Sequence, residues 1–324
     1  MYDRWLRSDW RIGCQADGEP SARRYAQTKY RLLLIDLAAR AAFLIVFQWC
    51  GASLALARGV SDVVSASWLL ILGYLAVMGT LAYLLALPLH FYGSFLLERR
   101  FTLSRLTIKG WVIREIKQLV IGGVLSAVVI EGFYGILRAA PDAWPLWATV
   151  GWIGFTVVLA RVFPTILLPV FYRTRPLEHE ELVKRLLALC QRAGCAALGV
   201  FRFDLGVETR KANAALAGLG KTRRVLVSDT LVERFSSEEI EGVLAHELGH
   251  QRYRHIIKLL ALSAFGSWLA FTFTKAISSV WVTRLELHGL ADIAGFPVLA
   301  LWWSFLGLAS LPIHNRPVAQ LPSL

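Results

Sequence analysis

Two histidines and a glutamate stand at a spacing that suits metal-dependent hydrolysis. His246 and His250 enclose the sequence Glu-Leu-Gly, so they are one turn apart if this segment is helical. Two such imidazoles project from one helix face and can bind a single metal ion. Glu247 lies one step further round, where its carboxylate can reach a metal-bound water without binding the ion itself. The pattern predicts a zinc site with His246 and His250 as ligands and Glu247 as general base.

The residues before the histidines carry the signals of a helix start. Ser236 and Glu239 have the spacing of a capping box, in which each side chain accepts a hydrogen bond from the other residue's backbone amide. Ile240, Val243 and Leu244 then supply an apolar face at helical spacing. The alternative interpretation is that the two histidines are ordinary surface residues on a helix near a bilayer.

The segment upstream of this helix predicts a small α+β region. A helix is expected over Glu180–Ala193, with Gly194 ending it. Short apolar runs predict three strands, at Val200–Leu205, Ala212–Ala217 and Val225–Val227. Residues 251–258 contain neither Pro nor Gly, so we expect the helix with the two histidines to continue toward the membrane.

The rest of the chain has the composition of a membrane protein. Apolar residues make up 56% and charged residues 18%, and the mean hydropathy is +0.51. Soluble domains contain about 45–50% apolar and about 25% charged residues. Asp36 and Arg40, four residues apart in the first apolar run, are expected to pair. Six runs are long enough to span a bilayer: Leu32–Ala57, Ser67–Tyr92, Leu119–Leu137, Trp144–Tyr172, Leu259–Val282 and Ala294–Ile313.

The distribution of basic residues predicts the orientation of these spans. The net charge is +12, and the Lys and Arg residues alternate between rich and poor segments. Fifteen lie between Arg173 and Lys258, whereas the loop after the fifth run has one. The positive-inside rule therefore places the amino terminus and residues 173–258 in the cytoplasm, and we expect a multi-pass protein of a bacterial inner membrane. The same rule accounts for the charge without a nucleic-acid partner.

These observations define the expected architecture. The fold class is mainly α: a polytopic α-helical membrane protein with about six transmembrane helices and a small α+β cytoplasmic catalytic region. We expect residues 1–172 to hold four transmembrane helices and a basic cytoplasmic loop. Residues 173–258 form the cytoplasmic metalloprotease region, and residues 259–324 form two further transmembrane helices and a short tail.

The segment Ser236–His255 resembles the active-site helix of the CAAX prenyl endopeptidases and the related heat-shock protease HtpX, which are membrane zinc metalloproteases. The resemblance implies that the catalytic region is gluzincin-like. Asn213 and Ala214, followed by Gly218, resemble the edge strand of that family. Further similar segments are Glu98–Phe101, Val225–Leu231 and Leu290–Pro297.

The resemblance implies roles for further residues and for partners. Asn213 and Ala214 would hold an extended substrate by strand addition, although Asn213 is also compatible with an ordinary turn or edge residue. His255 would assist the oxyanion, or is a structural or interfacial histidine. The expected partners are a peptide or membrane-protein substrate, of membrane-associated or CAAX type, and the lipid bilayer.

The third zinc ligand of the family is missing from this sequence. The family takes it from a Ser-Arg-x-x-Glu helix after the last span, whereas residues 316–324 contain no acid. Glu286 and Asp292 lie in a loop expected on the opposite side of the membrane, and His314 is a conceivable substitute. The sequence therefore leaves two hypotheses beside each other. One is a zinc endopeptidase; the other is a truncated or frame-shifted chain, or a pseudoprotease, that at most binds peptides.

Overall fold

The computed structural model describes the backbone of residues 18–195, 197–206, 213–218, 223–252 and 255–319. Within these ranges, the side chains of residues 18–22, 250–256 and 310–319 lie outside the described part. Contacts group the chain into two compact units. Unit 1 comprises Met1–Leu97, Val124–Thr149 and Ser267–Leu324, and unit 2 comprises Glu98–Gly123 and Val150–Gly266.

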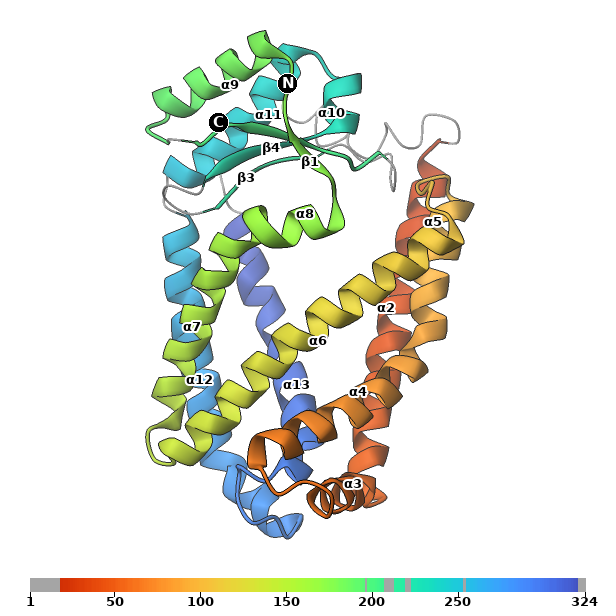
Figure 1. Cartoon of the computed structure of the whole chain (residues 1–324), viewed down its shortest axis with the longest axis vertical. Coiled ribbons are helices and arrows are strands. Elements are labelled where there is room, and N and C mark those ends of the chain that lie inside the picture. Colours follow the sequence, from red (N-terminus) through yellow and green to blue (C-terminus); the bar gives the residue numbers. More distant parts are fainter. Residues whose placement is uncertain (1–17, 196, 207–212, 219–222, 253–254, 320–324) are drawn as a thin grey trace. The chain divides into compact units, whose positions relative to one another are not determined.

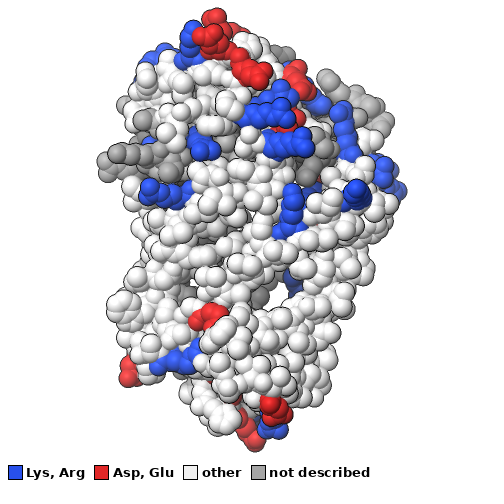
Figure 2. Space-filling view, in the orientation of Figure 1, with Lys and Arg blue, Asp and Glu red and all other residues white. Residues whose placement is uncertain are grey.

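Long apolar helices confirm the polytopic membrane fold. Five stretches of the described residues are long and apolar enough to cross a bilayer. They lie in α2 (Gly18–Trp49), α4 (Ser67–Phe91) with its continuation to Arg100, α6 (Ile108–Ala139), α7 (Trp144–Val162) with its continuation to Phe171, and α12 (His255–Arg284) (Figure 1). The sixth expected span forms α13 (Phe296–Ala319) and the turn before it, and the described apolar stretch there, Ile293–Ala309, is shorter than the other five. Figure 2 shows few charged side chains over the surfaces of these helices.

Short segments connect or extend the long helices. The short helix α3 (Ala52–Ser61) follows α2, and the 3₁₀ turn η4 (Ile293–Gly295) precedes α13. The π-helical turn η1 (Tyr92–Leu96) joins α4 to α5 (Leu97–Arg100), and η2 (Phe163–Leu167) joins α7 to α8 (Leu168–Phe171). Pro164 lies within η2, where its ring prevents regular α-helical hydrogen bonding.

The core of unit 1 is aromatic, with hydrogen-bonded polar groups inside it. Tyr74, Phe133, Tyr134 and Trp144 are all buried in one cluster. Ser53 donates a hydrogen bond to the carbonyl of Ala294 at 2.6 Å, and its Oγ lies 2.6 Å from the Tyr74 hydroxyl. Because the single Ser53 proton is used on Ala294, the Tyr74 hydroxyl is the donor in the second bond.

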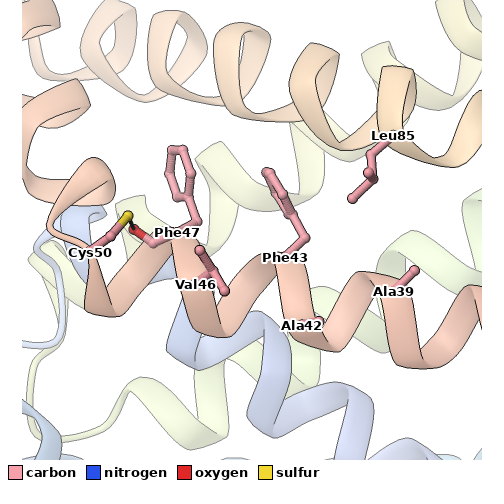
Figure 3. A pocket seen from close by; sticks show the side chains of 7 residues that line it. All are labelled: Ala39, Ala42, Phe43, Val46, Phe47, Cys50 and Leu85. Atoms are coloured by element: carbon pink, nitrogen blue, oxygen red, sulfur yellow. Dashed lines mark hydrogen bonds between the residues drawn. The ribbon is translucent and has the colours of Figure 1, made fainter.

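Helix α2 carries two further features of unit 1. The expected pairing of Asp36 with Arg40 is confirmed, since Arg40 Nε donates to the Asp36 carboxylate at 2.8 Å. An apolar groove of about 420 Å³ also follows this helix (Figure 3). The groove has no charged side chain in its lining, so it does not resemble a hydrolytic site. Its lining residues are Ala39, Ala42, Phe43, Val46, Phe47, Cys50 and Leu85.

Unit 2 contains a four-stranded sheet in the order β1-β2-β4-β3. Its strands are β1 (Thr174–Pro176), β2 (Val200–Phe203), β3 (Ala214–Ala217) and β4 (Arg224–Ser228). The central pair β2–β4 is parallel, and the edge strands β1 and β3 are antiparallel to their neighbours. Three of these strands match the sequence prediction. The fourth, β1, has only three residues and no apolar alternation, so the sequence carries no strand signal there.

Helices cover both faces of this sheet. Helices α9 (Glu180–Arg192) and α11 (Ser237–Arg252) lie on one face, and α8 lies on the other (Figure 1). Val225 and Val227 of β4 belong to the core on the α9 and α11 side, whereas Leu226 between them packs with Leu168 of α8. This alternation is the two-residue period of a strand buried on both faces. Gly194 ends α9 with φ +68°, in agreement with its expected role. The division of the chain at residues 172 and 258 stays a prediction.

Candidate metal centre

Helix α11, which carries the two histidines, begins with the expected capping box. The Ser236 amide donates to the Glu239 carboxylate at 2.9 Å, and the Glu239 amide donates to Ser236 Oγ at 3.3 Å. Ile240, Leu244 and Leu248 recur every fourth residue, are each at most 3% exposed and belong to the core above the sheet. The cap and this apolar stripe fix the rotation of α11 about its own axis.

That rotation directs the candidate ligands away from the core. His246 and His250 each lie two residues, or about 200°, from the buried Leu248, so their positions are on the opposite face of the helix. The His246 side chain is exposed and the Glu247 side chain is half-buried. The backbone of His250 belongs to α11, while its side chain lies outside the described residues. The three residues thus share one helix as predicted, and their roles stay predictions.

A pair of ionic contacts ties α11 to α9. Arg185 of α9 donates through Nη1 to Glu238 at 3.0 Å and through Nε to Glu241. A hydrogen bond from its own backbone amide, followed by the Arg185 contact, lowers the pKa of Glu238 below its ordinary value. Both acids lie in the first turns of α11, so Arg185 joins the start of this helix to its neighbour.

The junction between β4 and the short helix α10 (Asp229–Arg234) anchors the ends of two strands. The buried Asp229 carboxylate accepts hydrogen bonds from the amides of Leu205, at 2.9 Å, and Gly206, at 2.8 Å. A Cβ at Gly206 would lie 2.9 Å from Asp229 Oδ2, so this close approach requires glycine. The segment that directly follows β2 is therefore held at the end of β4.

Asn213 and Ala214 lie at the beginning of the edge strand β3, as the resemblance implies. The Ser228 amide donates to the Asn213 carbonyl at 2.8 Å, and the Asn213 amide donates to Ser228 Oγ, also at 2.8 Å. The Asn213 side chain is exposed, whereas Ala214 is buried in the core shared with α11. Helix α11 packs against β3, so the strand expected to bind substrate is a neighbour of the helix with the candidate ligands.

The remaining candidate residues do not complete a described metal site. His255 is the first residue of α12, and His314 lies in α13; both side chains are outside the described residues. Asp292 is used structurally, because it caps η4 by accepting the Ala294 amide at 3.0 Å. Among the described side chains, no cluster of three or more His, Cys, Asp or Glu residues could hold a metal ion.

The donors that are present fit a zinc ion in chemistry. Imidazole is a preferred zinc ligand, and the exposed His246 side chain on the helix face opposite the core is accessible to an ion. Sequence reasoning did not single out Arg185, Ser228 or Asp229, which position α11 and β3. A signal was present for Ser228, since a serine directly after an apolar strand and before a helix is an N-cap pattern.

Comparisons with known proteins agree with this arrangement. A family model described as the CAAX prenyl protease N-terminal region with five membrane helices matches residues 19–173, and the model of peptidase family M48 matches residues 176–306. The crystal structure of Ste24p from S. mikatae shares the fold, with a TM-score of 0.78 and 23% sequence identity over 90% of this chain and 72% of that chain.

Curated relatives extend the comparison to sequence. CAAX prenyl protease 1 of Saccharomyces cerevisiae is 31% identical over 206 residues, which are 63% of this chain and 45% of that protein. The protein named uncharacterized metalloprotease YhfN, of Bacillus subtilis, is 24% identical over 298 residues, which are 91% of this chain and 70% of that protein. The match thus spans less than half of the yeast protein. The resemblance stated from the sequence is confirmed: the two family models together account for nearly the whole chain, which belongs to peptidase family M48, and it is a multi-pass membrane protein with the helical fold of that family.

Proposed function

We propose that this protein is a membrane-embedded, zinc-dependent endopeptidase that hydrolyses peptide bonds of membrane-associated or CAAX-type substrates. The observation that carries the proposal is the capped helix α11, whose buried stripe directs the His246 and His250 positions away from the core. Glu247 lies beside them, and the edge strand β3 packs against the same helix.

His246 and His250 would hold the zinc ion, together with a third ligand that this sequence does not identify. When bound, zinc polarises a carbonyl oxygen and lowers the pKa of a coordinated water to about 7. The Glu247 carboxylate accepts a proton from the attacking water and delivers it to the nitrogen of the leaving amine. The Glu247 side chain is half-buried, so its carboxylate still reaches the surface of the helix next to His246.

The substrate would bind in extended form along β3. Asn213 directly precedes this edge strand and Ala214 begins it, and its outer side has no partner strand among the described residues. Strand addition gives main-chain hydrogen bonds that do not depend on substrate sequence. His255 would stabilise the oxyanion. The names of several relatives include the words CAAX prenyl protease, which supports peptides of that class as the first substrates to test.

The distribution of basic residues supports a site that faces the cytoplasm. Most Lys and Arg residues between the spans fall in the stretch that contains α9, α10 and α11. Labelling of single cysteines introduced at exposed positions, such as Glu180 and Asp62, tests this topology in intact cells. A membrane-impermeant reagent added outside should label position 62 and not position 180, and the reverse result would contradict the orientation.

The proteolytic proposal is tested with purified full-length protein in nanodiscs. Glu247→Gln should retain the metal content of the wild-type protein and lower peptide cleavage by about 10²–10⁴-fold, because the proton acceptor is lost. His246→Ala should lose the metal. Glu233→Gln is the matched control, since Glu233 pairs with Arg202 on the surface of α10, outside the proposed site. Equal cleavage by Glu247→Gln and wild-type protein would exclude the role of Glu247.

A peptide-binding protein without hydrolysis is the second candidate function. It is suggested by the sequence, because residues 316–324 contain no acid where the resemblance places the third metal ligand. In that case the wild-type protein would contain little zinc after purification in zinc-supplemented buffer, would bind a labelled peptide and would not cleave it.

A further inference from the structure

The pairing of β3 with β4 determines which backbone groups of the edge strand point outward. In an antiparallel pair, residues that exchange hydrogen bonds alternate with residues whose N–H and C=O groups point away from the partner strand. The Ser228 amide donates to the Asn213 carbonyl, so these two residues form a hydrogen-bonded pair. In the observed register, the pair two residues further along is Ala215 with Leu226. Ala214 and Leu216 therefore direct their N–H and C=O groups to the open edge.

The second hydrogen bond of the Asn213–Ser228 pair involves a side chain. The Asn213 amide donates to Ser228 Oγ at 2.8 Å, in place of the Ser228 carbonyl. Ser228 is the N-cap of α10, and its Oγ also accepts the Leu231 amide at 3.2 Å. The carbonyl of an N-cap residue accepts the first hydrogen bond of its helix. The hydroxyl of Ser228 thus extends the ladder by one residue beyond the point where the β4 backbone turns into a helix.

We propose that Ser228 is a positioning residue that sets which residues of β3 present their backbone to an extended peptide. This inference rests on the proposed function, in which the peptide adds to that edge. With Asn213 held on Ser228, the amides and carbonyls of Ala214 and Leu216 bind the peptide, and those of Asn213 and Ala215 face β4. The expected substrate is therefore an extended peptide whose backbone N–H and C=O groups are available for hydrogen bonds at two positions that lie two residues apart.

Side-chain packing selects the same register. Ala214 is buried in the core shared with α9 and α11, and Leu216 packs against that core, whereas Ala217 packs on the opposite face of the sheet. A slip by one residue would exchange the faces of all these side chains. Such a slip would also turn the backbone of Asn213 and Ala215 outward. The Ser228 hydroxyl and the apolar core thus favour a single arrangement of the open edge.

Hydrogen exchange of the full-length protein tests the positioning without any substrate. Ser228→Ala should increase exchange in a peptide covering residues 213–218, because the Asn213 amide loses its acceptor. Ser228→Thr, which keeps the hydroxyl, should exchange more slowly there than Ser228→Ala. His179→Ala is the matched control, since it removes the N-cap of α9 in the same unit without a contact to β3. Unchanged exchange of β3 in Ser228→Ala would overturn the proposal.

Binding of a labelled extended peptide tests the recognition. Single N-methyl groups are placed at successive positions of the peptide. For the wild-type protein, two positions that are two residues apart should each raise the Kd about tenfold, and the position between them should not. Ser228→Ala should raise the Kd of the unmodified peptide about three- to tenfold and leave the zinc content unchanged.

The outcomes separate this inference from the proposed function. Equal losses at consecutive N-methyl positions, or a Kd for Ser228→Ala equal to that of the wild-type protein, would overturn the inference. Absence of peptide binding to the wild-type protein would exclude recognition by this edge. Absence of cleavage, with the alternating binding pattern intact, would exclude only the proteolysis.

Discussion

The strands β1–β4 with helices α9, α10 and α11 form the sheet-bearing region. This region and the membrane helices position their buried polar groups by different means. In the region around α10, Ser228 and Asp229 accept hydrogen bonds from backbone amides at the ends of strands and helices. In the membrane helices, Thr274 donates to the Ala270 carbonyl one turn earlier and accepts a hydrogen bond from Trp302 Nε1 at 3.0 Å. Long helices satisfy their own backbone amides, so hydroxyls inside them often donate to the carbonyl one turn earlier in the same helix, and contacts such as that of Thr274 with Trp302 join one helix to another.

This difference has a consequence for a catalytic site. A side chain that binds the backbone fixes where a strand or helix begins, as Ser228 does for both β3 and α10. A contact between two side chains fixes only how two finished helices face each other. A site that needs backbone groups at defined positions is therefore better supported by the small sheet than by a helix bundle.

The largest expected effect comes from the core beneath α11. Leu244→Ala would remove a side chain that is 1% exposed and would destabilise the sheet-bearing region by about 3 kcal/mol. Local unfolding free energies of β4 and of residues 124–139 of α6, which belong to unit 1, should show the loss in β4 alone when measured by hydrogen exchange. Val128→Ala on α6 is a control, because Val128 is exposed and belongs to the other unit. An equal loss in α6 would show that the two units unfold together.

Two tyrosines test the hydrogen bonding inside the membrane helices. Tyr74→Phe removes the donor to Ser53 and should lower the free energy of unfolding by about 1 kcal/mol. The Tyr134 hydroxyl is buried without a hydrogen-bond partner among the described residues, so Tyr134→Phe should cause no loss. Thermal unfolding in identical micelles compares the two variants. A loss for Tyr134→Phe equal to that for Tyr74→Phe would show that Tyr134 binds a partner such as a buried water.

Local sequence signals predicted the parts of the site that depend on local structure. The capping box at Ser236 and Glu239, the end of α9 at Gly194 and the strand β4 all follow from short-range patterns. The resemblance placed Asn213 at the edge of the sheet. The hydrogen bond of Asn213 with Ser228 joins positions fifteen residues apart, so it depends on strand register and could not be read from spacing.

Other features could not be predicted from the sequence, for different physical reasons. Strand β1 is held by pairing with β2 and has no apolar pattern of its own. The grouping of Val124–Thr149 with Ser267–Leu324 arises from tertiary contacts between segments far apart in the chain. The third metal ligand has no local signal in this sequence, because a catalytic zinc site can take its last ligand from any element that reaches it.

The smallest expected effect concerns the ionic contacts between α9 and α11 at the surface of the sheet-bearing region. Arg185→Met removes the contacts to Glu238 and Glu241 that join α9 to α11, whereas Lys184→Met removes only a pair with Glu180 within α9. In the folded protein the pKa of Glu238 is lowered, so the unfolded state binds protons more readily. The stabilisation is therefore fully present above the ordinary carboxyl pKa and is lost as the pH falls through the lower, folded-state value. The difference in stability between wild-type protein and Arg185→Met, followed by hydrogen exchange of α11, should shrink on acidification. If Lys184→Met gave the same loss at neutral pH, the link between the two helices would have no special role in holding α11.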